Sequence, residues 1–388
     1  MMSPSTFTCR WGILGTGWMS DKFVSDLLYD RSVRGAVDVA HEIAAVGSRS
    51  VESAQRFVDE AWKQKGLTEG KDKIKLYGVY AELFRDQDID CVYIASPHSH
   101  HFSHAHAALS AGKNVLLEKS ATVNAKQLQI LVDLAREKKL FLAEALWTRC
   151  LPYAAKLREI LESGVIGQIR GVSVEMCADS SDTWSKDPKN RMANPNLAGG
   201  SLLDLGPYPY TQLALTLQPP SKASLEPLPV PKVVASATKT PAGTDASITA
   251  ALQFTQPDGR VVQGVMQCAI DRYTPVDRCG VIQGSLGYIT ISSPANRPSA
   301  ITVEHFGAGH PYWHAGLEHE TTTHGFDYPQ GFWGFAYEAD EVARCLRDGK
   351  TESDLLPLRE SLLMIQVFDE IRRQNDLVYP EAIETTSP

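Results

Sequence analysis

A glycine-rich turn between an apolar run and an amphipathic segment is the feature that most constrains the fold of this chain. The turn reads Gly12-Ile-Leu-Gly15-Thr-Gly17-Trp-Met-Ser20, and it overlaps the apolar run Trp11–Leu14. In a strand–turn–helix unit, Gly15 permits the tight turn and Gly17 lets the backbone approach a pyrophosphate, which the free N–H groups of the helix start then bind. Ser20 replaces the usual third Gly or Ala and is small enough for the same helix–strand packing. The turn therefore predicts a dinucleotide-binding unit.

Short apolar runs alternate with longer amphipathic segments over the first 148 residues. The apolar runs predict strands at Trp11–Leu14, Glu42–Val46, Cys91–Ala95, Asn114–Leu117 and Phe141–Glu144. The amphipathic segments predict helices at Trp18–Leu28, Val51–Lys65, Glu82–Phe84, His101–Ala111 and Ala125–Lys138. Strands that alternate with helices in this way indicate βαβ units and a parallel, Rossmann-type sheet that is covered on both faces.

The pattern changes after Trp147, where helices at Ala154–Glu162, Phe332–Arg347 and Leu358–Gln374 flank a series of alternating segments. Those segments predict strands at Ile169–Met176, Val233–Ala237, Ala246–Phe254, Gly264–Ile270, Cys279–Gln283, Tyr288–Ile291 and Ala300–His305. Period-2 alternation is typical of an antiparallel, half-exposed sheet. We therefore predict an α/β fold with two domains. Residues 1–148 form the dinucleotide-binding domain. Residues 149–388 form an α+β domain for substrate binding and dimerisation, whose last helices have room to pack back on the first domain.

Composition limits the partners and the compartment. With 38 basic and 46 acidic residues the net charge is −8, and no basic block offers a surface for nucleic acid or an anionic membrane. No stretch reaches the ~20 apolar residues of a membrane span, and residues 1–10 lack the order of a signal peptide. The seven scattered cysteines include no CxxC pair and predict reduced thiols. We expect a cytoplasmic enzyme that acts on a small molecule.

The end of the second predicted strand bears on the choice of dinucleotide. An NAD site places Asp or Glu there to bind the ribose 2′-hydroxyl. This chain has Ser48-Arg49-Ser50 instead, two hydroxyls and a guanidinium that match a 2′-phosphate. The segment therefore favours NADP over NAD. The alternative interpretation is a solvated arginine at a helix start.

Five of the eleven histidines lie at positions 98, 100, 101, 104 and 106. His100 and His104 are one helical turn apart and have the spacing of a metal-binding pair. No carboxylate or cysteine lies among the five, so we predict that the chain has no metal site here.

Two motifs follow consecutive predicted strands, ASPHSHH at 95–101 and LEKS at 117–120. Together with the glycine turn, they resemble the AxPxxxH and EKP signatures of the Gfo/Idh/MocA oxidoreductase family, and His101 matches the histidine of the first signature. The segments EALWTRCLP at 144–152 and NPNLAGGSLLDLGPYP at 194–209 resemble one branch of that family. This branch comprises the dimeric dihydrodiol dehydrogenases and the fungal NADP-dependent D-xylose 1-dehydrogenases. The resemblance covers nearly the whole chain.

The resemblance implies a catalytic pair, Lys119 and Tyr208. Oxidation of a sugar C1 hydroxyl needs a base for its proton while hydride leaves C1 for the nicotinamide. A free tyrosine is a poor base at neutral pH, so we expect the Lys119 ammonium to lower the pKa of Tyr208. Asp204, four residues earlier, is expected on the same helix face, where it would orient the pair.

The resemblance also implies the residues that bind the ligands. The cofactor set is Gly15, Thr16, Gly17, Trp18, Met19, Ser48, Arg49, Ser50, Ser96, Pro97, His98, His101, Glu118 and Lys119. The substrate set is Trp147, Arg149, Asp204 and Tyr208. Ser120 stands where the family has proline, so a cis-proline after Lys119 is unavailable, and the sequence leaves the backbone geometry at the lysine open.

These features predict an NADP-dependent oxidation of an aldose, D-xylose first, at C1 to the aldonolactone. A trans-1,2-dihydrodiol dehydrogenase is the alternative, because the same pair would serve it, as is activity on a different aldose. Intact Lys119, Asp204 and Tyr208 argue against a dinucleotide-binding redox sensor without catalysis. Glucose–fructose oxidoreductase chemistry usually comes with an export signal and an N-terminal arm, and neither is evident. The uncovered face of the antiparallel sheet leads us to expect a homodimer.

Overall fold

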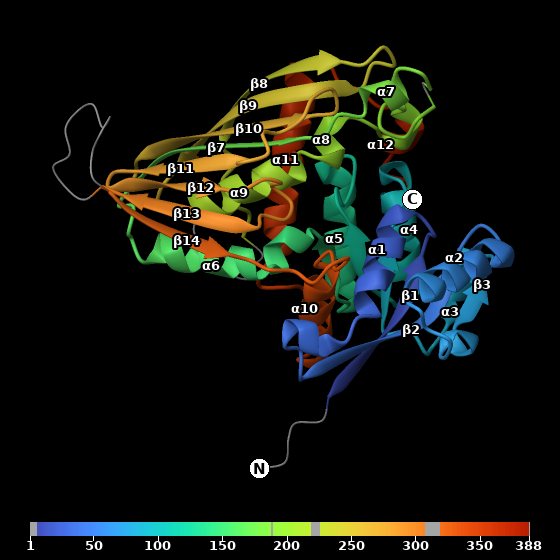
Figure 1. The fold of residues 1–388 in the computed structure, drawn as a ribbon. Helices are drawn as coiled ribbons and strands as arrows, with labels where there is room; N and C mark the ends of the chain where they lie inside the picture. Colours follow the sequence, from blue (N-terminus) through green and yellow to red (C-terminus); the bar gives the residue numbers. More distant parts are fainter. Residues whose placement is uncertain (1–5, 188, 219–225, 307–318, 388) are drawn as a thin grey trace.

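The computed structural model describes residues 6–187, 189–218, 226–306 and 319–387. They form two sheets, the first at the lower right and the second at the upper left of Figure 1. The first sheet has six parallel strands in the order β3-β2-β1-β4-β5-β6. Their bounds are β1 (Phe7–Leu14), β2 (Val39–Gly47), β3 (Lys75–Tyr77), β4 (Cys91–Ile94), β5 (Asn114–Glu118) and β6 (Leu142–Ala145).

Five helices connect these strands. They are α1 (Trp18–Leu27), α2 (Val51–Gln64), α3 (Tyr80–Arg85), α4 (His98–Ser110) and α5 (Ala125–Lys138). Each lies where the sequence pattern predicts a helix, and the predicted α/β fold is confirmed. The pattern does not predict β3, because this three-residue edge strand contains no apolar run.

The second sheet has eight strands in the order β14-β13-β12-β11-β7-β10-β9-β8. Their bounds are β7 (Ile169–Cys177), β8 (Lys232–Lys239), β9 (Asp245–Thr255), β10 (Val261–Ala269), β11 (Gly280–Gly284), β12 (Gly287–Ile291), β13 (Ala300–His305) and β14 (Glu320–Gly325). All neighbours are antiparallel except β7 and β10, so the predicted mostly antiparallel sheet is confirmed. The pattern misses β14, an edge strand with the sequence ETTTHG that lacks apolar alternation.

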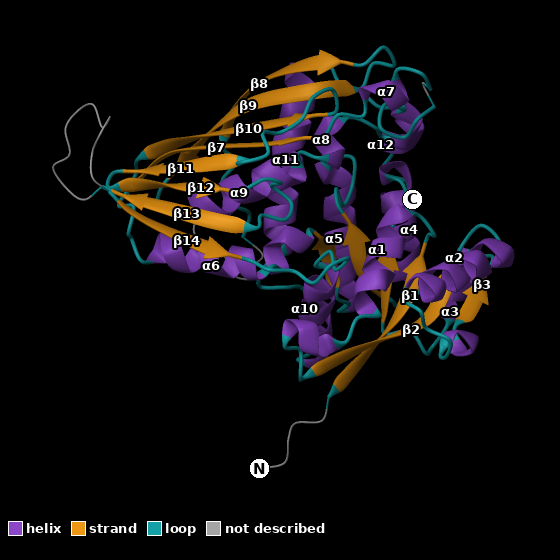
Figure 2. Cartoon of the chain, in the orientation of Figure 1, coloured by secondary structure: helices purple, strands orange, loops and turns teal. Residues whose placement is uncertain are grey.

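Helices cover one face of this second sheet. The helices of this part of the chain are α6 (Pro152–Glu162), α7 (Ser181–Trp184), α8 (Ser201–Asp204), α9 (Pro207–Leu217), α10 (Phe335–Arg347), α11 (Leu358–Gln374) and α12 (Glu381–Glu384). Three of them, α6, α9 and α11, pack against the sheet and lie on one side of it in Figure 2. On β9, Ile248 and Leu252 are buried whereas Thr249 and Gln253 are exposed, which confirms the half-exposed pattern. No helix among the described residues is long and apolar enough to cross a membrane.

The C-terminal part of the chain returns to the first sheet. The α10 helix packs against α1, β1 and β2, and its N-terminus is capped by a carboxylate from α1. Asp26 accepts hydrogen bonds from the backbone N–H groups of Trp333, Gly334 and Phe335 at 2.8, 2.6 and 2.8 Å. These donors have no partner within α10, because the first N–H groups of a helix never do. We propose the domain boundary at 148/149, with α10 joined to the first domain through this cap.

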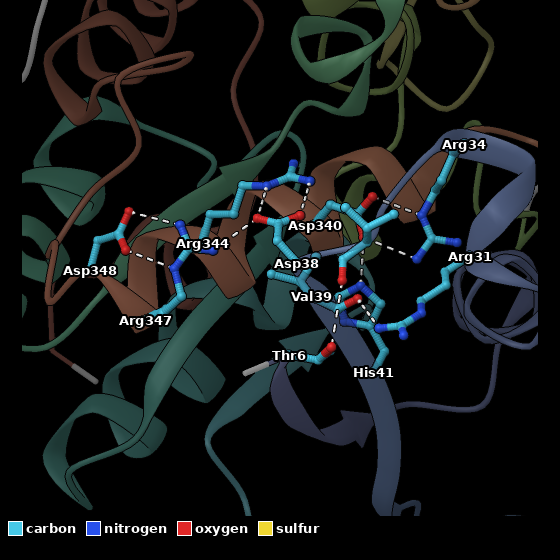
Figure 3. Close-up of polar contacts among 11 residues, drawn as sticks. Thr6, Arg31, Arg34, Asp38, Val39, His41, Asp340, Arg344, Arg347 and Asp348 are labelled. Carbon is cyan, nitrogen blue, oxygen red and sulfur yellow. Dashed lines mark hydrogen bonds and ion pairs between the residues drawn. The ribbon is translucent and has the colours of Figure 1, made fainter. Parts of the chain in front are cut away.

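A second contact fastens α10 to β2, and we call it the α10 latch: Arg34, His41 and Asp340 (Figure 3). Arg34 donates to the Asp340 carboxylate at 2.7 and 3.0 Å, and His41 Nε2 lies 2.8 Å from the same group. The Trp11 indole N–H donates to His41 Nδ1 at 3.1 Å, which leaves the proton on Nε2. Burial alone would raise the pKa of Asp340, but its bonds to His41 and Arg34 outweigh burial and lower it. Beside the latch, Asp38 makes more exposed pairs with arginines of α10.

Asp340→Ala should lower the free energy of unfolding by about 3–5 kcal/mol, because it leaves the Arg34 guanidinium buried without a counter-charge. The Arg34 and Asp340 side chains are 1% and 3% exposed. Asp348→Ala removes a carboxylate that pairs with Arg347 at the surface, and it should change stability little. Urea unfolding followed by circular dichroism measures both. Equal effects of the two variants would contradict the assigned role of the latch.

Candidate active site

A cavity of about 390 Å³ lies at the carboxyl ends of the parallel strands. Residues 17–19, 95–98 and 118–119 line it from the first domain, and residues 191–192 line it from the second. The strand order reverses between β1 and β4, and the cavity opens at that point. Open parallel sheets bind their ligands at such a switch point, so this cavity is the candidate active site.

The glycine turn has open space over it. Gly15 has φ +97°, and a Cβ there would lie 3.0 Å from the carbonyl oxygen of Ala95. A Cβ on Gly17 would meet nothing within 4 Å. The α1 helix begins directly afterwards at Trp18, and no side chain caps it. Free N–H groups beside an open surface fit a pyrophosphate.

The segment predicted to bind a 2′-phosphate lies between β2 and α2. The Thr16 hydroxyl lies 3.2 Å from that of Ser48 and 3.3 Å from that of Ser53. The Ser50 hydroxyl accepts the backbone N–H of Ser53 at 3.2 Å and so caps α2. Arg49 is exposed. The structure therefore groups the hydroxyls of Thr16, Ser48 and Ser53, and the exposed Arg49 follows Ser48 directly in the chain.

Two histidines after β4 contact the backbone of Lys119 and Ser120. His98 Nε2 lies 3.2 Å from the carbonyl oxygen of Lys119. The two ring nitrogens of His101 lie 2.9 Å from the carbonyl oxygen of Ser120 and 2.8 Å from that of Ser96. Burial lowers the pKa of His98 to about 4 and that of His101 to about 3. Both rings are therefore neutral at pH 7, and because a neutral imidazole carries a single N–H, each donates to only one of the carbonyl oxygens beside it.

The Lys119–Ser120 peptide bond is cis. The backbone after Lys119 therefore has the cis geometry without a proline. The Ser120 hydroxyl donates to the carbonyl oxygen of Leu203 at 3.0 Å, and the Ser120 carbonyl meets His101. These bonds hold the residue in place and tie the end of β5 to α8.

The Lys119 ammonium is the centre of the site. It is 7% exposed, and it donates to the carbonyl oxygen of Asp204 at 2.6 Å and to Oδ1 of the same residue at 3.4 Å. Burial alone would lower the pKa of Lys119, but the acidic groups of Tyr208, Asp204 and Glu118 outweigh burial and raise it. Burial alone would raise the pKa of Asp204, but Lys119 and Arg191 hold it well below its usual range. At pH 7 the two residues form an ion pair.

Tyr208 lies beside this ammonium, with the Lys119 Nζ 5.2 Å from the ring centroid. The Trp147 indole N–H donates to the Tyr208 hydroxyl at 3.3 Å. Asp204 is the last residue of α8, whereas Tyr208 lies in α9, which begins at Pro207. The prediction that both share one helix face is wrong, because a proline starts a helix and interrupts the preceding one. Lys119 is the contact that the two residues share.

The pKa of Tyr208 is above its ordinary value. Burial raises it and Lys119 lowers it, and the effect of burial is the larger. The expected net lowering of this pKa is therefore wrong for this chain. Tyr208 is a neutral phenol at pH 7, ready to donate a proton, and it depends on Lys119 to become a base.

Arg149 does not belong to the site. Its guanidinium is 6% exposed and donates to the Glu360 carboxylate at 2.7 Å and to the carbonyl oxygen of Leu355 at 2.8 and 3.0 Å. The prediction of Arg149 as a substrate contact is therefore wrong, since its donors face these groups. Trp147 is 1% exposed and, like Tyr208, is not among the residues that line the cavity; its indole N–H contacts the Tyr208 hydroxyl.

The other histidines of the cluster lie outside the cavity. His104 Nδ1 lies 3.0 Å from the Ser96 hydroxyl, and His100 Nδ1 lies 2.8 Å from that of Ser99. Within the described ranges, no group of three His, Cys, Asp or Glu side chains has the arrangement of a metal site.

Sequence reasoning missed Arg191 and Ser53. Arg191 lines the cavity and lies 3.3 Å from Asp204 Oδ1, but it precedes the NPNLAGG segment in a polar loop, where a single arginine carries no signal. Ser53 lies in the first turn of α2, where serine is common as part of a helix start. Only the folded chain brings each beside a residue of the predicted site.

Two family models match this chain. The model of the Gfo/Idh/MocA oxidoreductase family, NAD-binding Rossmann fold, matches residues 9–145, and the model of the Gfo/Idh/MocA C-terminal domain matches residues 154–290. The first match spans the parallel sheet, and the second includes most strands of the other sheet.

Curated relatives are similar over nearly their whole length. The D-xylose 1-dehydrogenase (NADP(+)) of Hypocrea jecorina is 38% identical over 394 aligned positions, which cover 99% of this chain and 96% of that protein. The trans-1,2-dihydrobenzene-1,2-diol dehydrogenase of Bos taurus is 30% identical over 96% of this chain and 98% of that protein. Among solved structures, the aldose-aldose oxidoreductase of Caulobacter crescentus matches 95% of this chain and 98% of its own with a TM-score of 0.72. At 19% identity, that likeness is one of fold.

Proposed function

The chain belongs to the Gfo/Idh/MocA oxidoreductase family, and on this premise we propose that it oxidises an aldose at C1, with NADP as the hydride acceptor. One observation carries the proposal: Gly17 of the dinucleotide turn and Lys119, whose ammonium lies beside Tyr208, line the same cavity. The 38% identity to a D-xylose 1-dehydrogenase (NADP(+)) supports D-xylose as the sugar and the aldonolactone as the product.

The residues present fit NADP. Gly17 and the start of α1 would hold the pyrophosphate, and Arg49 with the hydroxyls of Thr16, Ser48 and Ser53 would hold the 2′-phosphate. The other proposed cofactor residues that line the cavity are Trp18, Met19, Ser96, Pro97, His98, His101, Glu118 and Lys119. Bound there, NADP supplies the nicotinamide carbon that accepts the hydride.

The chain's own groups handle the proton. In oxidation Tyr208 removes the proton of the C1 hydroxyl, and in reduction it returns that proton. Lys119 stabilises the phenolate that acts as the base and becomes a phenol in this step, Asp204 holds the ammonium, and Trp147 fixes the phenolic oxygen. Because burial raises the pKa of Tyr208, oxidation should speed up as the pH rises above 7.

A trans-1,2-dihydrodiol dehydrogenase is the second candidate. The bovine relative with this activity is 30% identical over 96% of the chain. The same tyrosine and lysine would remove a proton from a secondary alcohol of a diol. The shape of the substrate pocket decides between the aldose and the diol. This discrimination is small, because one extra methylene in a pocket changes selectivity by only about 1–3 kcal/mol.

Rates of NADP reduction with D-xylose, other pentoses, hexoses and trans-1,2-dihydrobenzene-1,2-diol test the proposal. We expect the highest kcat/KM with D-xylose. A higher kcat/KM with the diol would favour the second candidate. Reduction of NADP with none of them would refute both.

We also propose that the protein is a cytoplasmic homodimer. The face of the second sheet opposite α9 and α11 exposes Val234 of β8 and Val261 of β10, which a second copy would cover. All seven cysteines are unpaired thiols, which supports a reducing compartment. Sedimentation at micromolar concentration should show twice the 42.6 kDa of one chain. A 42.6 kDa species would refute the dimer.

Lys119→Met and Tyr208→Phe should each lower kcat at least about 100-fold, within the ~10²–10⁴ range of general acid–base catalysis. The double variant should lose little more than either single one, because each group acts through the other. Tyr210→Phe is the matched control, since Tyr210 is a buried tyrosine of the same helix whose hydroxyl accepts from Gln218, and it should keep its activity. Near-normal turnover of Tyr208→Phe would point to another base.

Arg49→Ala should raise the KM for NADP about tenfold or more, because a hydrogen bond to a charged group contributes about 1.5–3 kcal/mol. The KM for NAD, which has no 2′-phosphate, should change little. Arg56→Ala, on the exposed side of α2, is the control and should affect neither. Steady-state kinetics with both cofactors measure this, and equal use of NAD and NADP by the unmodified enzyme would contradict the 2′-phosphate assignment.

A further inference from the structure

Glu118 is a buried carboxyl in the cavity that the proton transfer described above does not use. It is the last residue of β5, it is 3% exposed, and it lines the cavity next to Lys119. Its Oε1 accepts the hydroxyl of Tyr93 at 2.6 Å, and its Oε2 accepts the backbone N–H of Lys119 at 3.1 Å. These bonds hold the carboxyl in place at the reacting end of the cavity.

The hydrogen-bond partners of Glu118 stay in contact with its carboxyl whether it is ionised or protonated. The ionised form accepts both donors. In the protonated form the carboxyl donates to the phenolic oxygen of Tyr93, and the Tyr93 hydroxyl turns its own hydrogen away from the carboxyl. The Tyr93 ring stacks on Phe23 with centroids 3.9 Å apart, and that contact holds it in both cases. Glu118 therefore gains or loses a proton without moving heavy atoms.

The groups around Glu118 leave its protonated and ionised forms close to equal in population at neutral pH. The titratable groups that face it are Lys119 next to it, Tyr93 of β4, Glu144 of β6, Tyr208 of α9 and Glu338 of α10. Burial raises the pKa of Glu118 to about 7, although Lys119 and the two hydrogen bonds lower it. Burial also raises the pKa of Glu144 and Glu338, but neither lines the cavity. Glu118 is therefore the carboxyl of this group that meets the ligand.

We infer that Glu118 exchanges a proton with solvent as the charge of the bound nicotinamide changes: it releases a proton when the cationic ring of NADP⁺ binds and keeps it beside the neutral ring of NADPH. The inference rests on the proposed function. A cation in the cavity favours the carboxylate, whereas a neutral ring does not. Over one turnover, Tyr208 takes the proton of the substrate hydroxyl and returns to the phenolate as Glu118 regains a proton, so one proton leaves per NADP⁺ reduced.

Calorimetric titration in two buffers with different ionisation enthalpies counts the protons exchanged per cofactor bound. The difference between NADP⁺ and NADPH isolates the nicotinamide, because both carry the same 2′-phosphate. At pH 7 we expect NADP⁺ to release about half a proton more than NADPH, since a carboxyl with a pKa of about 7 is half protonated there. At pH 9 the difference should vanish, because the carboxyl is already ionised.

Glu118→Gln should bind both cofactors and abolish this difference. Glu144→Gln is the matched control: Glu144 is equally buried, accepts the backbone N–H of Ala121 and lies outside the cavity, so the difference should persist. Binding of both cofactors to the unmodified enzyme with no difference in protons would overturn the inference, whether or not the variants fold. So would a difference that survives in Glu118→Gln. Failure of both cofactors to bind would instead overturn the proposed function.

Discussion

The candidate site depends on the compensation of one buried positive charge. The Lys119 ammonium is 7% exposed, and a buried ammonium is stable only beside an opposite charge and a hydrogen-bond acceptor. Asp204 supplies both, through its carboxylate and its carbonyl oxygen. Because Lys119 follows a strand of the parallel sheet and Asp204 ends a helix of the other domain, this contact joins the two domains at the cavity. Tyr208 owes its place beside the ammonium to the same junction.

Burial acts on every ionisable group around that charge, and it favours the neutral form. It lowers the pKa of His98 and raises the pKa of Tyr208 and Glu118. Lys119 and Asp204 stay charged despite burial because the charge of each stabilises that of the other. The site therefore keeps the charges of Lys119, Asp204 and Arg191 among groups that are neutral or nearly balanced. Among these groups Glu118 changes its protonation near pH 7 at little cost, whereas Tyr208 becomes a phenolate only with the help of Lys119.

The packing of α10 on the first domain brings one of its carboxyls close to the site. Asp26 caps the start of α10, and Asp340 fastens the middle of the helix to Arg34 and His41. Glu338 lies between these two contacts, and the charge of Glu118 raises its pKa. Two carboxyls 220 positions apart in the chain are thus neighbours, and the cap and the latch hold α10 in the place that brings them together.

Local patterns in the sequence determined the glycine turn and the alternation of strands and helices, whereas Lys119 and Tyr208 were identified through the resemblance of their motifs to the Gfo/Idh/MocA family. Periodicity and turn chemistry act over a few residues, so a sequence shows them directly. The edge strands β3 and β14, the latch and Arg191 have no such pattern, because each depends on a partner distant in the chain. The same reason explains the errors. Arg149 binds Glu360 and does not line the cavity. At Tyr208, burial raises the pKa more than Lys119 lowers it. Both outcomes depend on which side chains surround a group after folding.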